Sequence, residues 1–165
     1  MKTKAEIIDY VMRDLEGEYT NDANDAGGET LWGVTEIAWK DCLNQTDVEW
    51  PPYSFDYDTA KGVYEYFWDK MGVDYLPEVL QLPYFAFGFN AGYGTAIKFM
   101  QEELGLKVDG IAGPITRGSF REIPDIDLAL YGFVSHCVLY YSHLDDFVHF
   151  GRGWINRLLK SLIFT

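Results

Sequence analysis

The sequence predicts a mainly helical α+β fold in which strands are confined to one short segment. In nearly every stretch where apolar residues are periodic, they recur at helical spacing, as in the series Ile8, Val11, Met12 and Leu15. Residues 17–34 are the exception, because glycine, asparagine and aspartate crowd there without helical periodicity. This segment therefore leaves room for a loop with a small hairpin.

In the first half of the chain, helical patterns alternate with polar or proline-containing connectors. The expected helices are residues 3–16, 35–44 and 58–71. The hydroxyl of Thr35 can cap the second of these helices. Pro51 and Pro52 keep the stretch VEWPPYSFDYD out of a helix, because proline cannot donate the helical hydrogen bond.

In the second half, prolines and glycines divide the helical pattern. The expected elements are a short irregular helix between Pro77 and Pro83, a helix over residues 84–104 that FNAGYG bends or interrupts, a tight loop VDGIAGPIT, a short helix begun by Pro114, and helices over residues 126–144 and 154–164. No internal repeat is present.

Composition and charge limit the partners of the chain. Hydrophobic residues make up 48% of the 165 residues and aromatic residues 17%, enough for a real core. The net charge of −13 repels nucleic acid and anionic membranes, so we expect neither as a partner. The opening MKTKAEIIDYVMRD mixes acidic with apolar residues, so we also expect neither a signal peptide nor a membrane anchor.

Two carboxylates flank the polar segment after the first expected helix. Glycoside hydrolysis uses a protonated carboxyl group beside the leaving oxygen and usually a second carboxylate. Glu16 follows the apolar face of that helix, and apolar neighbours raise the pKa of a glutamate toward the range of a catalytic acid. Asp25 lies further along the loop, where a hairpin can bring it across a cleft.

Other side chains of this segment suit a sugar substrate. Tyr19 and Trp32 are candidates for contact with sugar rings, and the hydroxyls of Thr30 and Thr35 can orient a water molecule. The glycines among them allow tight turns and close approach of the backbone to a glycan.

Simpler interpretations of the same residues stay open. An acidic, glycine-rich loop after a helix is often only a solvated surface. A calcium loop fits poorly, because Ala26 occupies the third ligand position and Gly33 stands where the closing glutamate belongs. His143 and His149 lack a third metal ligand at a familiar spacing. We therefore expect no metal and no cofactor.

The opening motif resembles a family signature. EGEY followed by DAGGETLWGVT resembles the pattern EGGY and DPGGxTxxGIT of the glycoside hydrolase family 108 muramidases, which are phage-type endolysins. The resemblance implies a lysozyme-like fold of two lobes, with Glu16 as the catalytic acid and Asp25 as the loop aspartate. Thr30 and Thr35 match the threonines of the pattern.

The chain departs from the pattern at two places that affect the loop. Glu18 replaces the second glycine of EGG, which places another negative charge near Glu16. Ala26 replaces the proline of DPGG, which loosens the loop without removing a reactive group.

The resemblance extends to the second half of the chain. The segment FNAGYGTAIKFMQEELGLKVDGIAGPIT resembles a region of the family often described as peptidoglycan-binding, and HFGRGWINR resembles the closing segment. Asn90 and Tyr93 lie beside glycines and are our candidates for contact with glycan. Asp109, Gly110 and Gln101 can equally serve only to fix a turn.

The resemblance implies an N-acetylmuramidase (lysozyme) that cleaves the β-1,4 bond between N-acetylmuramic acid and N-acetylglucosamine in bacterial peptidoglycan. We expect residues 1–83 to form a catalytic lobe and residues 84–165 a helical lobe with the peptidoglycan-binding-like segment. The expected protein is a monomeric phage endolysin without a cofactor, held in the host cytoplasm until a holin releases it. A lytic transglycosylase and a non-catalytic peptidoglycan-binding protein are the alternatives.

Overall fold

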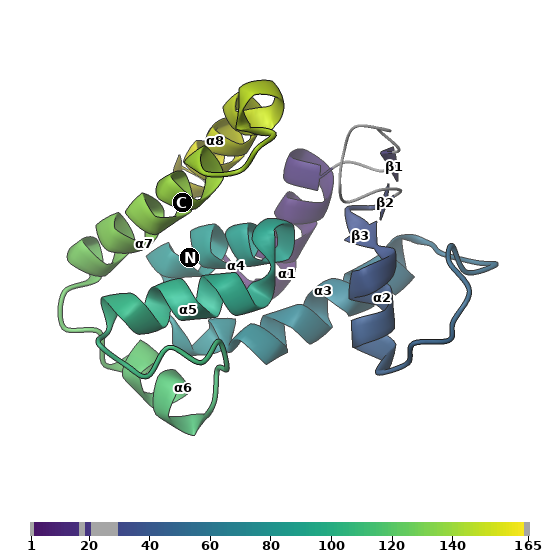
Figure 1. Cartoon of the computed structure of the whole chain (residues 1–165). Coiled ribbons are helices and arrows are strands. Elements are labelled where there is room, and N and C mark those ends of the chain that lie inside the picture. The colour runs from purple at the N-terminus through teal and green to yellow at the C-terminus, as the bar shows by residue number, and fades with distance from the viewer. Residues whose placement is uncertain (1, 17–18, 21–29, 164–165) are drawn as a thin grey trace. The chain divides into compact units, whose positions relative to one another are not determined.

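The structure is a computed structural model of the 165-residue chain, and it describes residues 2–16, 19–20 and 30–163 (Figure 1). The chain divides into two compact units, Thr3–Phe67 and Trp68–Thr165, the second of which also takes in residues 1–2. Described residues are mainly helical, with one small antiparallel sheet.

The first unit begins with a helix that changes type. Helix α1 (Lys4–Tyr10) starts at Thr3, whose side chain forms a capping box with Glu6. It continues directly into the π-helix η1 (Val11–Glu16). The predicted helix over residues 3–16 is therefore confirmed in extent, but its second half has the wider π geometry. Buried apolar side chains run through both parts, at Ile7, Ile8, Val11 and Met12.

The small sheet follows η1. Its strands are β1 (Tyr19–Thr20), β2 (Thr30–Leu31) and β3 (Val34–Thr35), in the antiparallel order β1-β2-β3. The predicted hairpin region is thus confirmed for the described residues.

Two further helices belong to this part of the chain. Thr35 caps α2 (Glu36–Leu43) as predicted, and the left-handed Asn44 ends it. Helix α3 (Tyr57–Met71) begins within one residue of the predicted start and runs into the second unit.

The compact units divide at residues 67 and 68, whereas the predicted lobes divide at residues 83 and 84. The end of α3 belongs to the second unit because its side chains pack there. Trp68 packs edge-on against Phe85 at 5.0 Å between ring centroids, and its indole N–H donates to Asp74 at 2.8 Å. The assignment of catalysis to the first lobe and glycan binding to the second stays a prediction.

The second unit is built around helix α4 (Glu78–Ala91), which is buried along one continuous stretch from Leu82 to Gly88. It contacts α5 (Tyr93–Glu103), α7 (Ile126–Ser142) and α8 (Phe147–Ile163), as Figure 1 shows. A helix that is buried on every side has apolar residues on all its faces, and the stretch of α4 from Leu82 to Gly88 fits this rule. The short 3-10 helix η2 (Val73–Tyr75) precedes α4, and α6 (Pro114–Arg121) follows α5.

Two predicted boundaries in this unit are wrong. We expected Pro83 to end a short helix, but α4 continues through it, because packing of the buried proline offsets the hydrogen bond that its ring removes. The last helix begins at Phe147 and not at Trp154. Both glycines of HFGRGW therefore lie inside α8, and the missing side chain at Gly151 leaves space for the Phe147 ring.

The remaining boundaries of this unit agree with the sequence. Helix α5 begins just after Gly92 in FNAGYG, Pro114 opens α6, and α7 spans most of the apolar run predicted over residues 126–144. No helix in the described part of the chain has both the length and the apolar character needed to cross a bilayer.

Candidate active site

Glu16 is the last residue of the π-helix η1, and strand β1 begins at Tyr19. A π turn closes i→i+5 hydrogen bonds, so it shifts the residues that follow it relative to the α-helical pattern. Such turns are frequent at functional sites. Glu16 thus stands at the end of such a turn. Asp25 lies outside the residues that the structure describes.

The sheet brings the two predicted threonines together. Thr30 in the central strand pairs with Thr20 on one side and Thr35 on the other. Directly opposed residues of an antiparallel pair place their side chains on the same face. Thr30 and Thr35 therefore share one face, although they come from different strands.

Thr35 also holds the start of helix α2. Its hydroxyl oxygen accepts a hydrogen bond from the backbone N–H of Ala38 at 3.1 Å. Because the N-cap role uses a lone pair of this oxygen, the hydroxyl proton is left for donation. Thr35 can thus cap the helix and still donate to a water molecule or a sugar.

Trp32 lies in the turn that joins β2 to β3. Trp32 and Gly33 have φ angles of 54° and 75°, as both central residues of a type I′ hairpin turn require. The Tyr64 hydroxyl donates to the Trp32 carbonyl at 2.9 Å, and the Trp32 ring meets Tyr57 edge-on at 5.2 Å. The turn is therefore held from helix α3 at both its backbone and its side chain.

A polar cluster that sequence reasoning missed lies beside this turn. The Tyr57 hydroxyl donates to Asp9 at 2.5 Å, and Lys61 forms an ion pair with the same carboxylate at 3.2 Å. The Arg13 guanidinium lies over the Tyr57 ring, 4.6 Å from its centroid. Tyr57 thus contacts α1, η1 and Trp32. The spacing of Asp9 and Arg13 on one helical face was visible in the sequence, but their partner on α3 was not.

The cluster also shifts the pKa values of Asp9 and Lys61. The hydrogen bond from Tyr57, with the charges of Lys61 and Arg13, holds the pKa of Asp9 below its ordinary value of 3.8, against a smaller opposing effect of burial. The hydrogen bond and charge of Asp9 raise the pKa of Lys61 above 10.5. Both shifts indicate that the ion pair stabilises the charged forms.

The predicted glycan-contacting residues of the second half lie at the junction of α4 and α5. Asn90 is exposed on the last turn of α4, and Gly92 has a φ of 96°. The Lys70 ammonium lies 4.4 Å from the centroid of the Tyr93 ring. The Tyr141 hydroxyl donates to Asn90 Oδ1 at 3.2 Å. Sequence reasoning found Asn90 and Tyr93 but neither Lys70 nor Tyr141.

The predicted site residues therefore fall into two groups. Glu16, Tyr19, Thr30, Trp32 and Thr35 belong to the first compact unit. Asn90 and Tyr93 belong to the second.

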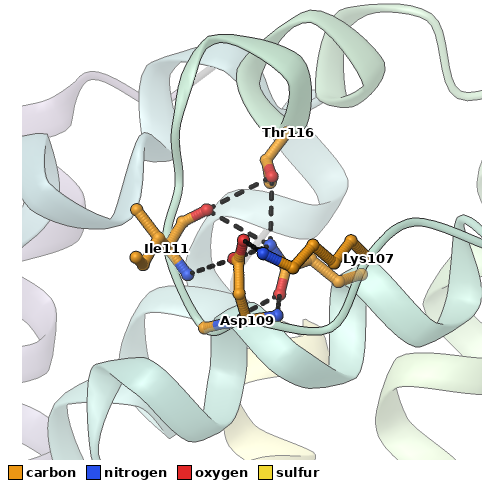
Figure 2. A network of polar contacts seen from close by, with 6 residues as sticks. Lys107, Asp109, Ile111 and Thr116 are labelled. Atoms are coloured by element: carbon orange, nitrogen blue, oxygen red, sulfur yellow. Dashed lines mark hydrogen bonds and ion pairs between the residues drawn. The ribbon is translucent and has the colours of Figure 1, made fainter.

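The loop VDGIAGPIT forms the polar network of Figure 2. The amide of the buried Gln101 donates to Asp109, to the Ile111 carbonyl and to Thr116, and its oxygen accepts from the backbone N–H groups of Asp109 and Gly110. Gly110 has a φ of 74°, so the turn needs a glycine there. These contacts give the segment a structural role. In the described ranges, no cluster of three His, Cys, Asp or Glu side chains is arranged to hold a metal.

The fold is of the lysozyme-like α+β class, and the family match identifies the chain as a glycoside hydrolase. The chain belongs to the glycosyl hydrolase 108 family, whose model matches residues 8–92, just over half of the 165 residues. It is accordingly a peptidoglycan hydrolase. The matched range includes all the predicted site residues except Tyr93.

One solved structure extends the comparison to nearly the whole chain. The structure of SagA from Brucella abortus superposes with a TM-score of 0.84 at 24% sequence identity, covering 96% of this chain and 90% of that one. The predicted lysozyme-like fold is thereby confirmed. None of the curated proteins compared with the chain matches it.

Proposed function

We propose that the protein is an N-acetylmuramidase that hydrolyses the β-1,4 bond between N-acetylmuramic acid and N-acetylglucosamine. One observation carries the proposal. In a chain of the glycosyl hydrolase 108 family, Glu16 ends a π-helix directly before a sheet that pairs Thr30 with Thr35. This order along the chain supports the proposal, because a candidate acid is followed by hydroxyls that can hold a water molecule.

In the proposed reaction, Glu16 protonates the glycosidic oxygen as the bond from that oxygen to the anomeric carbon breaks. Positive charge develops on the sugar ring, and Asp25 stabilises it. Water adds to the anomeric carbon and gives its proton to a carboxylate. Thr30 or Thr35 orients this water, and Thr35 suits the task because its capping bond leaves the hydroxyl proton available.

Four other side chains would contact the glycan in this proposal. Tyr19 belongs to strand β1 and Trp32 to the turn between β2 and β3, and an aromatic ring can stack on the apolar face of a sugar. Asn90 offers amide hydrogen-bonding groups at an exposed helix end. Tyr93 stands after Gly92, which lets the glycan approach the backbone closely.

The replacement Glu16→Gln tests the proposal. It keeps the size of the side chain but removes the proton that the leaving oxygen needs. We expect peptidoglycan digestion to fall by about 100- to 10 000-fold, which is the usual contribution of a general acid. The measurement is digestion of purified peptidoglycan, with mass spectrometry of the released fragments.

The control is Glu122→Gln, which removes an exposed carboxylate at the end of α6 and should leave digestion unchanged. Muramic reducing ends that vanish only with Glu16→Gln would support the muramidase. Anhydro-muramic ends would identify a lytic transglycosylase instead. A wild-type protein that binds sacculi and releases no fragments would have a binding role only.

We further propose that the enzyme acts as a phage endolysin, made in the host cytoplasm as a monomer and released by a holin. The resemblance of its signature EGEY and DAGGETLWGVT to phage-type muramidases supports this role. Expression in a bacterial host should cause lysis only when a holin is expressed with it. Culture turbidity would report the result, and rapid lysis by the enzyme alone would contradict the role.

A further inference from the structure

The side chain of Asn90 is held by a residue from a different helix. Asn90 is exposed on the last turn of α4, and the Tyr141 hydroxyl of α7 donates to its Oδ1 at 3.2 Å. The two residues are 51 positions apart in the chain.

Tyr141 is itself fixed by packing. Its side chain is 2% exposed, and its ring stacks on Trp154 of α8 with 5.4 Å between centroids and 25° between planes. The Phe87 ring of α4 packs edge-on against the Tyr141 ring, with 5.4 Å between the two ring centroids. The hydroxyl that reaches Asn90 therefore projects from a rigid site where three helices meet.

An asparagine amide has an acceptor oxygen on one side and two N–H donors on the other. Because the Tyr141 hydroxyl engages the oxygen, the N–H groups of Asn90 are turned the other way. Among the described residues, none accepts a hydrogen bond from these N–H groups. Asn90 thus presents an oriented and exposed pair of donors.

We propose that Tyr141 is a positioning residue that aims the Asn90 amide N–H groups at an acceptor oxygen of the glycan, the carbonyl of an N-acetyl group. An amide carbonyl is the strongest neutral acceptor that an N-acetylated sugar offers. The inference rests on the proposed muramidase function, in which Asn90 contacts the substrate. It adds the residue that orients Asn90 and the sugar group that Asn90 recognises.

The test is a cycle of Tyr141→Phe, Asn90→Ala and the double variant. Tyr141→Phe keeps the packed ring and removes only the hydroxyl. We expect it to raise KM for soluble peptidoglycan fragments about two- to tenfold with kcat unchanged, which is the usual loss for one hydrogen bond. Asn90→Ala should raise KM at least as much. Adding Tyr141→Phe to Asn90→Ala should change KM no further.

Two controls separate this role from a structural one. Tyr140→Phe removes the hydroxyl of the neighbouring residue, which is half-buried against Phe99, and should leave KM unchanged. Asn90→Asp keeps an oxygen for Tyr141 but has no N–H donor, so it should resemble Asn90→Ala in KM. Thermal unfolding of each variant would verify that the fold is kept.

The inference is overturned if Tyr141→Phe raises KM as much in the Asn90→Ala background as in the wild type, or if Asn90→Asp binds like the wild type. Failure of the muramidase proposal looks different, because the wild type would then release no muramic reducing ends. In that case the wild type, Tyr141→Phe, Asn90→Ala and the double variant are compared by the fraction bound to isolated sacculi. Equal binding of these four proteins would overturn the inference by itself.

Discussion

Gln101 uses every hydrogen-bonding group of its side chain on the turn that follows α5. Its amide makes three donor contacts, at 2.9, 3.1 and 3.2 Å, and its oxygen accepts two backbone N–H groups at 2.9 and 3.0 Å. The side chain is 1% exposed, so water cannot replace these contacts. One side chain thus contacts four residues of the turn, of which Figure 2 labels Asp109, Ile111 and Thr116.

We expect Gln101→Ala to lower the free energy of unfolding by roughly 2–4 kcal/mol, because it removes all five hydrogen bonds and leaves the backbone N–H groups of Asp109 and Gly110 without their acceptor. Urea unfolding would measure the loss. The matched control is Gln81→Ala, since the half-buried Gln81 makes one bond, to the Leu76 carbonyl. The control should lose about 1 kcal/mol or less. Equal losses in the two variants would show that the network does not hold the turn.

At the scale of elements, the cluster of Asp9, Tyr57 and Lys61 ties α1 to α3 within the first unit. A carboxyl group whose pKa is lower in the folded chain stabilises the fold above its unfolded pKa, and this stabilisation is lost as the pH falls through the folded pKa. Asp9 is such a group, with an ordinary value of 3.8. The pKa of Lys61 is shifted upward instead. Its contribution to the stability of the fold is therefore lost only in alkaline solution, above pH 10.5.

Asp9→Asn should therefore lower the unfolding temperature near pH 7. Its effect should shrink as the pH falls below about 4, where the carboxyl group is protonated first in the unfolded chain and, at lower pH, in the folded chain. Thermal unfolding of both proteins from about pH 3 to pH 7 would test this. Asp47→Asn, at an exposed position of the connector after α2, serves as the control and should follow the wild type. A constant difference across the whole range would contradict the role of the charge.

Local signals predicted elements well, whereas packing decided those that were missed. The cap of α2 at Thr35 and the start of α6 at Pro114 depend on one or two adjacent residues, so the sequence contains them. The path of α4 through Pro83 depends on burial, which neighbouring residues do not reveal. The start of α8 at Phe147 was missed although its close neighbour Gly151, which leaves space for the Phe147 ring, is only four residues away.

The residues of the candidate site also differ in whether local sequence could predict them. Glu16, Thr30 and Asn90 come from the motif and its resemblance, and their roles stay predictions. Tyr57 and Tyr141 act through partners 48 and 51 residues away, so no local pattern pointed to them. The sequence thus named the groups expected to react and contact the substrate, but not the residues that hold them.

At the scale of the whole molecule, the charge of −13 contrasts with the substrate of the family. The stem peptides of peptidoglycan carry carboxylates, so bulk charge cannot attract this enzyme to the wall. Its own field is screened within roughly 10 Å at 0.1 M salt. Recognition must therefore come from short-range contacts, such as hydrogen bonds and ring stacking.

The spacing of the polar contacts also has a consequence for the order of folding. The Gln101 network joins residues only 8 to 15 positions apart, so closing this loop has a small entropic cost. The bond from Tyr141 to Asn90 needs α4, α7 and α8 in place and spans 51 positions. We expect the turn to be an early structure on the folding pathway and the oriented amide a late one. A nascent chain would then acquire this turn well before it holds the amide that we propose recognises the glycan.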